Sequence, residues 1–457
     1  MTPSTDARPS RRYITAALLV GLGLGAMVVL SHSLLALLAP AMLALLLLMA
    51  LVRRLGRDFD DPDVGRQLMA WTIIAFVTHV VFGLVVTNVY GGVLDYLRAP
   101  DAFAYHSLAE DILRHWTTGV PGPELPAGKE GFYYVLAALY WVFGAHTAAG
   151  LVLNAALSAA LVPLVTDTTR RLFGEGPATR VPPLVALLPG LFIWTSQLLK
   201  EAPILFLIAL AAACAVRFLE RVAAAPVLGL SLALAALFTF RAWVALVIAG
   251  GFVAALLVGR QQLAIGLTSG VTVLAILAVV VGLGLGYSGY RAAVDADLTQ
   301  AQTVRQDLAS AESGYDADVD VSTSRGALSY MPRGLVSFLL GPFPWQVRSA
   351  RQLIVAPDVL VWWLLLPSLW RGLRQARRLI GRGMLVLVLP AITTSMLLAL
   401  AVGNFGTVVR ERGQVTILLV PIIALGLAAR ARARSASQSQ DAEILAVEPA
   451  RAHTVMA

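Results

Sequence analysis

The chain alternates between continuous apolar stretches and short polar segments rich in arginine. An apolar helix of roughly 20 residues spans the hydrocarbon core of a bilayer. Because the stretches do not alternate apolar and polar residues, the pattern favours helices over the strands of a membrane barrel. It predicts an all-α polytopic membrane protein with about twelve spans, at residues 13–30, 34–52, 70–90, 148–168, 181–198, 202–219, 224–240, 242–259, 262–288, 356–371, 383–402 and 414–429. We interpret the first span as an uncleaved anchor, because no convincing cleavage site follows it.

The composition excludes several classes of protein. Of the 457 residues, 58% are hydrophobic and 14% charged, and the mean hydropathy is +0.76. A soluble domain carries roughly 25% charged residues, so a soluble multidomain enzyme is excluded. The one cysteine, Cys214, lies in an apolar run and rules out internal disulfides and cysteine-based metal sites. No nucleic-acid-binding module is visible, and no nucleic-acid partner is expected.

One apolar segment, residues 131–145, decides the predicted topology. At ~1.5 Å per residue it covers about 22 Å, less than the ~30 Å core, and its aromatic residues favour the membrane interface. We therefore predict a helix lying on the outer surface. With both termini in the cytoplasm, most arginine clusters then fall in cytoplasmic segments, as is usual for multi-pass proteins of the plasma (inner) membrane.

Two outer segments are long, at about residues 91–147 and 289–355, and both are expected to carry surface helices. The predicted organisation is one transmembrane domain over residues 1–434, followed by a disordered cytoplasmic tail at 435–457. Because the other loops are short, the chemistry or binding is expected on the outer side.

The first outer segment holds the leading candidate for a catalytic group. Asp101 begins an amphipathic helix, with an apolar stripe of Ala104, Leu108, Ile112 and Trp116. The helix dipole favours an ionised carboxylate, which would accept a proton from an attacking hydroxyl. The alternative is a structural helix cap. The neighbouring Tyr105 and His106 would orient a polar ligand; alternatively, His106 is only an interface residue.

Several outer cations are candidates for binding an anionic substrate. Lys200 lies in a short hairpin with Glu201, which would modulate it; the alternative is ordinary loop charge. Arg241 lies between two apolar runs, where a guanidinium is costly unless it pairs, and a phosphate is a good partner. Arg410 and Arg412 form a basic patch before the last span, where a lipid phosphate would dock; the alternative is a solvated hairpin.

Motifs of other enzyme classes are absent from the sequence. It contains no Walker A motif, no HExxH and no glycine-rich nucleotide fingerprint. The predicted spans hold almost no ionisable residue except His79, whereas proton-coupled transporters place carboxylates at mid-membrane. No motif implies a cofactor or names a metal ligand, and a divalent metal stays an open alternative.

The order of these features resembles a known class of membrane enzymes. The matching runs are PDAFAYHSLAEDIL, KEGFYYVLAALYWVFG, LVLNAALSAALVPLVTDTTRRLFG and ALLPGLFIWTSQLLKEAPILFLIAL. They are similar to polytopic glycosyltransferases of the GT-C superfamily, which includes protein O-mannosyltransferases and aminoarabinose transferases, and to its bacterial exopolysaccharide-type members. The likeness covers about residues 90–260. The sequence departs from the pattern in having no second acid beside Asp101, and Lys129–Glu130–Gly131 where some branches have lysine and two prolines.

The resemblance implies transfer of a sugar from a polyprenyl-phosphate carrier to an acceptor hydroxyl of a glycan, lipid or protein, in cell-envelope or exopolysaccharide assembly. Asp101 would then be the base, and Lys200, Arg241, Arg410 and Arg412 would hold the donor phosphate. The alternatives are a polysaccharide polymerase or ligase, which shares this outer-face chemistry, and a non-enzymatic transporter or flippase of lipid-linked sugars.

Overall fold

The computed structural model describes residues 34–126, 129–221, 223–257, 297–347, 349–379 and 383–454. All regular elements in these ranges are helical. They are α2 (Leu34–Gly56), α3 (Pro62–Asn88), α4 (Val93–Leu97), α5 (Asp101–Thr118), α6 (Glu130–Phe143), α7 (Thr147–Phe173), α8 (Glu175–Ala178), α9 (Val181–Leu187), α10 (Pro189–Thr195), α11 (Glu201–Glu220), α12 (Ala224–Phe240), α13 (Ala242–Leu257), α16 (Leu298–Ala309), α17 (Ser324–Leu340), the 3₁₀ helix η2 (Pro344–Gln346), α18 (Ala350–Leu379), α19 (Leu385–Ala401) and α20 (Phe405–Thr454).

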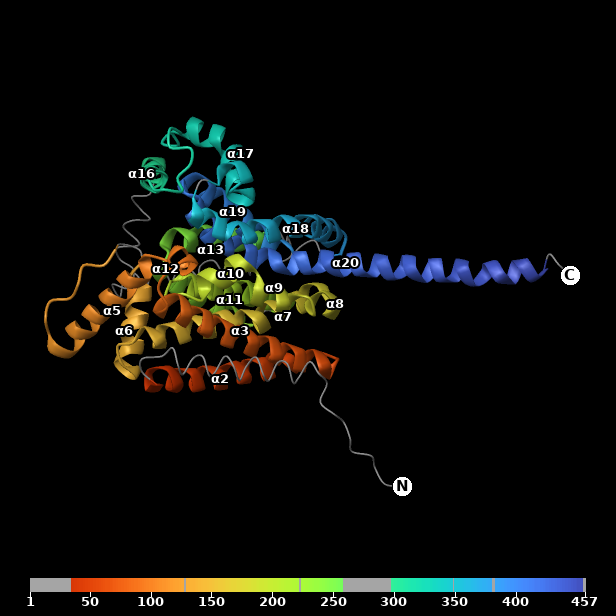
Figure 1. Cartoon of the computed structure of the whole chain (residues 1–457), viewed down its shortest axis with the longest axis horizontal. Coiled ribbons are helices and arrows are strands. Elements are labelled where there is room, and N and C mark those ends of the chain that lie inside the picture. The colour runs from red at the N-terminus through yellow and green to blue at the C-terminus, as the bar shows by residue number, and fades with distance from the viewer. Residues whose placement is uncertain are drawn as a thin grey trace, which may run out of the picture.

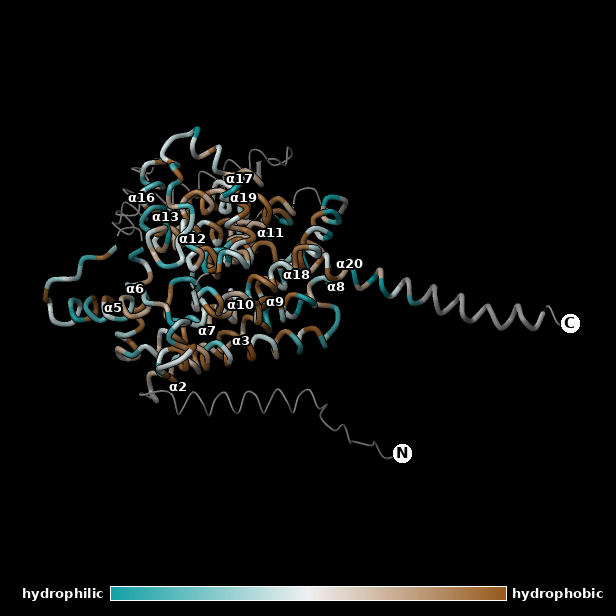
Figure 2. The backbone as a smooth tube through the Cα atoms, turned by 45° about the horizontal axis from the view of Figure 1, so that its top comes forward, coloured by the Kyte–Doolittle hydropathy of each residue, from teal (hydrophilic) through white to brown (hydrophobic). Residues whose placement is uncertain are grey.

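Five of the described helices are long and apolar enough to cross a membrane, namely α2, α3, α7, α11 and residues 405–435 of α20. The bent pair of residues 175–187 and 189–195 makes a sixth if it counts as one span, and α12, α13 and α19 are shorter apolar helices. The protein is therefore an all-α membrane protein, whereas the finer count of twelve spans stays a prediction. Figure 2 shows hydrophobic residues concentrated in the central helices and hydrophilic ones around α5 and at the base of the α20 tail.

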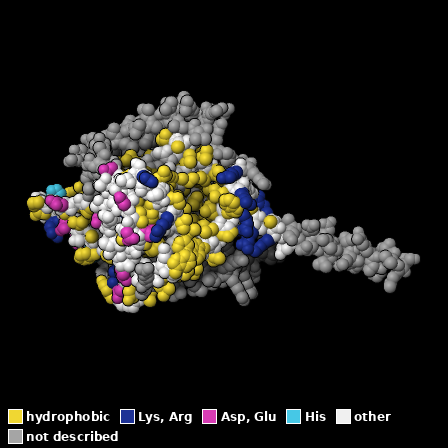
Figure 3. Space-filling model, turned by 90° about the horizontal axis from the view of Figure 1, so that it is seen from above, with side chains coloured by type: hydrophobic (Ala, Val, Ile, Leu, Met, Phe, Trp, Pro, Cys, Tyr) yellow, Lys and Arg dark blue, Asp and Glu magenta, His cyan; other side chains and the backbone are white. Residues whose placement is uncertain are grey.

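The helices form an elongated bundle with two distinct ends (Figure 1). At one end Asp101, the first residue of α5, pairs with Arg410 near the start of α20, and we call this the Asp101 end. At the other end, the buried Asp167 of α7 accepts hydrogen bonds from Arg170, Arg171 and Arg217, and we call this the Asp167 end. Figure 3 shows a hydrophobic band between acidic side chains towards the α5 end and a basic cluster beside the base of the α20 tail. The arginines at the C-terminal ends of α7 and α11 thus meet at the Asp167 end.

Two predicted boundaries need correction. The span at 181–198 is broken, because α9 ends at Leu187 and α10 begins at Pro189, with a bend of 50°. Leu188 is pushed out of the helical region by the proline that follows it. The tail expected to be disordered is helical as far as Thr454, because extending an existing helix avoids the cost of nucleation. The predicted spans 13–30 and 262–288 lie outside the described residues.

The segment at 131–145 forms α6, a helix of 14 residues that packs against α5. The side of α5 that faces inward carries Tyr105, Ala109 and Ile112, whereas Ala104 and Trp116 of the predicted stripe are exposed. The Tyr105 ring lies 4.9 Å from the rings of both Phe132 and Tyr133 on α6. The predicted stripe is therefore confirmed for Ile112 and the partly buried Leu108 and wrong for Ala104 and Trp116, because aromatic packing against α6 also buries Tyr105.

Candidate functional site

Asp101 stands at the first residue of α5, on a loop that is fixed to the rest of the bundle. The Ala99 N–H donates to Gln197 Oε1 (2.9 Å), and Gln197 Nε2 donates to the Leu97 carbonyl (3.1 Å). The helix cap is Pro100, and no side-chain cap bond is formed, so Asp101 does not act as the structural cap of the alternative interpretation. Its carboxylate instead accepts a hydrogen bond from Arg410 Nη1 at 2.8 Å, across 309 residues of chain.

Arg410 joins three carboxylates at the start of α20. Besides Asp101, its Nε atom lies 3.1 Å from Glu201 Oε1 and 4.0 Å from Glu411 Oε1. Glu411 is itself almost fully buried and pairs with Arg241, which lies between α12 and α13. This network connects the beginnings of α5, α11 and α20 with the α12–α13 junction.

Two lysines complete the group. Lys200, beside Glu201, is 2% exposed, and Lys129 precedes α6. Neither lysine has an ion pair within the described ranges. We call Asp101, Lys129, Lys200, Glu201, Arg241, Arg410 and Glu411 the charge cluster. Its four cations exceed its three carboxylates by one formal charge, so the cluster is suited to an anionic ligand.

The charges within the cluster shift the pKa values of its members. Burial raises the pKa of the Asp101 carboxyl, but the charge and hydrogen bond of Arg410, helped by Lys200 and Lys129, outweigh this and hold the pKa below its usual value. Burial, together with Arg241 and Lys129, places the pKa of Lys200 well below its usual value. Asp101 is therefore ionised at neutral pH. An anion that binds beside Lys200 would raise its pKa and favour its charged form.

The remaining polar neighbours of Asp101 play different parts. Tyr105 is buried, and burial together with Glu201 raises its pKa, so it stays a neutral phenol at the edge of the cluster. His106 is directed away from Asp101: its Nδ1 lies 2.9 Å from the Tyr140 hydroxyl, and its Nε2 lies 3.5 Å from Glu110. The structure thus brings Tyr105 to the site but not His106.

Arg412 lies apart from Arg410. It is 2% exposed, its Nε donates to the Phe338 carbonyl at 3.0 Å, and a second donor reaches the Gly341 carbonyl. Its Nη1 lies 3.9 Å from Asp358 of α18. Residues two positions apart in a helix point to different sides. The predicted basic patch is therefore divided: Arg410 belongs to the charge cluster, and Arg412 makes a buried contact between helices.

No protein-family model matches the chain, and no curated protein is significantly similar to it in sequence. The functional assignment therefore depends on the resemblance in the quoted runs and on the geometry of the charge cluster.

Two members of the charge cluster, Lys129 and Glu411, were not among the predicted site residues. A signal for Lys129 existed in the composition, because the chain has 35 basic residues and only two of them are lysines. Both lysines come to the same site, and each is followed by glutamate. Glu411 carried no comparable signal. Within the described residues, no group of three or more His, Cys, Asp or Glu side chains is arranged to hold a metal ion.

Proposed function

We propose that the protein is a membrane glycosyltransferase that moves a sugar from a polyprenyl-phosphate-linked donor to an acceptor hydroxyl. We further propose that the Asp101 end faces the outer side of the plasma membrane, because the arginine-bearing helix termini at the opposite end fit the cytoplasmic side. One observation supports the reaction most strongly: an ionised, half-exposed carboxylate lies in a cluster with surplus positive charge, and its two lysines have no ion pair among the described residues.

The proposed reaction uses this arrangement directly. The acceptor oxygen attacks the anomeric carbon of the donor sugar and forms the new glycosidic bond. The bond between that carbon and the phosphate oxygen breaks, and the polyprenyl phosphate leaves with the electron pair. Asp101 accepts the hydroxyl proton, while Lys200, Lys129 and Arg241 stabilise the negative charge on the leaving phosphate.

Arg410 connects the binding step with the base. In the structure its guanidinium group is shared between Asp101 and Glu201. A donor phosphate that takes over part of this guanidinium weakens its hold on Asp101. The pKa of the Asp101 carboxyl then rises towards its usual value, and the carboxylate becomes a stronger base once the donor is in place.

The test is transfer by the purified full-length protein, supplied with radiolabelled polyprenyl-phosphate sugars and candidate glycan, lipid and protein acceptors. We expect Asp101→Asn to reduce transfer at least a hundredfold, the lower end of general-base contributions. The protein should stay folded, with a melting temperature lowered by no more than a few degrees through loss of the ion pair with Arg410. Asp111→Asn is the matched control, because Asp111 lies on the same helix and, among the described residues, pairs with Arg114 alone at the surface. Transfer at the wild-type rate in Asp101→Asn contradicts the proposal.

The same preparation separates the alternatives. Release of polyprenyl phosphate with extension of a glycan chain by many units indicates a polymerase, and transfer of a preassembled glycan indicates a ligase. Movement of the intact lipid-linked sugar across a vesicle bilayer, without release of the phosphate, indicates a flippase and excludes the proposed reaction.

A further inference from the structure

A separate cavity of about 180 Å³ lies beside the charge cluster, between α4, α10, α18 and α20. Pro100 and Arg410 form part of its wall, but the Arg410 guanidinium group is directed to Asp101. The cavity therefore adjoins the proposed catalytic pair, with the stem of Arg410 between them. Its other lining residues come from the ends of α4 and α10, from residues 311–313 and from the beginnings of α18 and α20.

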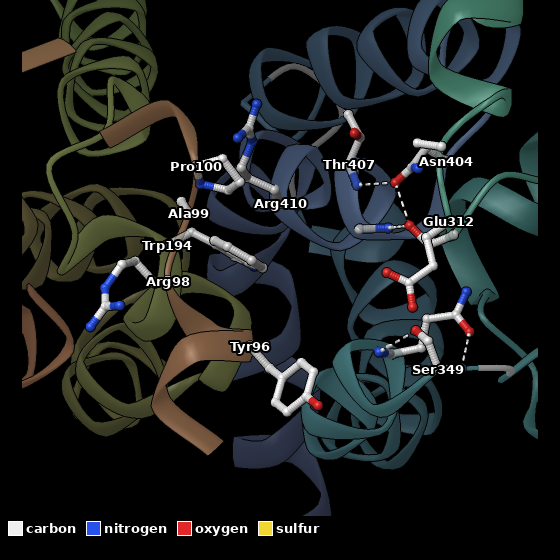
Figure 4. A pocket seen from close by; sticks show the side chains of 14 residues that line it. Tyr96, Arg98, Ala99, Pro100, Trp194, Glu312, Ser349, Asn404, Thr407 and Arg410 are labelled. Carbon is white, nitrogen blue, oxygen red and sulfur yellow. Dashed lines mark hydrogen bonds between the residues drawn. The ribbon is translucent and has the colours of Figure 1, made fainter. Parts of the chain in front are cut away.

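The side chain that most clearly indicates a ligand is Trp194, from the last turn of α10. Figure 4 shows its indole ring pointing into the cavity. The residue is 8% exposed, and its Nε1 atom is buried without a hydrogen-bond partner among the described residues. A buried N–H without a partner is costly, whereas a ligand oxygen in the cavity would satisfy it.

The opposite wall of the cavity is polar and already ordered. Asn404 caps α20, since its Oδ1 accepts the Thr407 N–H (3.1 Å) and the Ser313 hydroxyl (2.8 Å). Ser349 and Gln352 bond to each other at the start of α18. These bonds fix the polar groups around the cavity without dependence on a ligand, as expected of a binding site that is largely pre-formed.

The charges around the cavity select a neutral ligand over an anion. The Arg98 guanidinium group is occupied by Asp95 and by the carbonyls of Val86 and Val89. Glu312 adds a carboxylate on the opposite wall. An anionic ligand would meet this carboxylate, and among the described residues that line the cavity it would gain no free cation.

A pyranose ring combines a face of C–H groups, which packs on an aromatic plane, with a rim of hydroxyls. Trp194 and Tyr96 supply aromatic surface, and Glu312 supplies an acceptor for hydroxyl groups. We propose that this cavity binds a sugar ring, with the Trp194 N–H donating to a ring or hydroxyl oxygen. The inference rests on the proposed function, since it assigns a sugar subsite to that transferase. Either the donor sugar or a sugar of a glycan acceptor supplies this chemistry.

Direct binding tests the subsite without depending on turnover. Methyl glycosides of glucose, galactose, mannose and N-acetylglucosamine are titrated into the purified full-length protein and followed by saturation-transfer NMR. Trp194→Phe keeps an aromatic ring and removes only the N–H, so we expect the best-bound glycoside to bind roughly three- to tenfold more weakly. Trp194→Ala should abolish detectable binding. Trp141→Phe is the matched control, because Trp141 is 70% exposed on α6 and does not line the cavity.

Three outcomes distinguish this inference from the proposed function. Glycoside binding that weakens in Trp194→Phe but not in Trp141→Phe supports the subsite, even in a preparation that transfers no sugar. Binding that is equal in the wild type and Trp194→Phe overturns the subsite, and so does the absence of binding by every glycoside in a preparation that transfers sugar. Free glycosides that bind the cavity should compete either with the polyprenyl-phosphate sugar or with the acceptor. If Trp194→Phe removes the competition with the polyprenyl-phosphate sugar, the cavity binds the donor sugar. If Trp194→Phe removes the competition with the acceptor, the cavity binds a sugar of the acceptor.

Discussion

The bond between Asp101 and Arg410 allows a quantitative test of the proposed base. Replacing Arg410 with glutamine removes the cation that lies 2.8 Å from the carboxylate, while the Asp101 side chain is 49% exposed and that of Arg410 is 19% exposed. Exposed ion pairs contribute up to about 1 kcal/mol, and breaking a buried one costs about 3–5 kcal/mol. After allowance for solvent screening, this half-exposed pair contributes about 1–2 kcal/mol, which corresponds to a change of about one in the pKa of Asp101.

The direction of the change follows from the causes of the shift. In the wild type Arg410 holds the pKa of Asp101 below its usual 3.8, so the ionised base is lost only as the pH falls through that lower pKa. Without Arg410, burial raises the pKa of the carboxyl, so the base is lost at a higher pH than in the wild type.

The measurement is kcat/KM for transfer as a function of pH in the wild type, Arg410→Gln and Arg410→Lys. We expect the acid limb of Arg410→Gln to lie about one pH unit above that of the wild type, with a smaller displacement for the lysine variant, which keeps the charge. A lower overall rate with an unmoved acid limb would refute the reasoning, because Arg410 would then contribute to donor binding without tuning Asp101.

Three further predictions address stability and donor binding. Asp167→Asn should lower the free energy of unfolding by about 3–5 kcal/mol, and with it the melting temperature, because three guanidinium groups lose their shared buried carboxylate. A loss of stability no larger than that caused by Asp58→Asn, at a more exposed carboxylate, would contradict this. Gly426→Ala should destabilise by about 1–3 kcal/mol, because the added Cβ would lie 1.8 Å from a backbone carbonyl of α18, whereas Gly176→Ala, in open space, should change the melting temperature little. Lys200→Gln should raise the KM for the donor roughly tenfold with less effect on kcat, and an unchanged KM would exclude Lys200 from phosphate binding.

Hydropathy was sufficient to predict elements whose character is set by apolar length. The predicted span 224–240 has the same bounds as α12, and the span 202–219 differs from α11 by one residue at each end. Where a single residue changes the backbone, hydropathy carries no information. Pro189 breaks the apolar run 181–198 into two helices, although the run is long enough to continue as one.

Part of the site was predictable from the positions of the apolar runs, and part was not. Lys200 and Arg241 each lie at the edge of an apolar run, and Asp101 lies in the outer segment that follows another. The alternation of spans brings such positions to one end of a bundle. The sequence around Arg410 and Arg412 was interpreted as a basic patch before the last span, which was predicted to begin only at residue 414. In the structure α20 already starts at Phe405, so successive residues are turned by about 100° and the two arginines serve different partners.

The separation of Asp101 and Arg410 along the chain also has a consequence for biosynthesis. Arg410 is translated 309 residues after Asp101, which at about 5–20 residues per second is a delay of roughly 15–60 s. During that interval the nascent protein gains both lysines and Arg241, but it has neither Arg410 nor Glu411. The ribosome must therefore complete most of the polypeptide before the aspartate meets its arginine, and a chain terminated early has no means of assembling this centre.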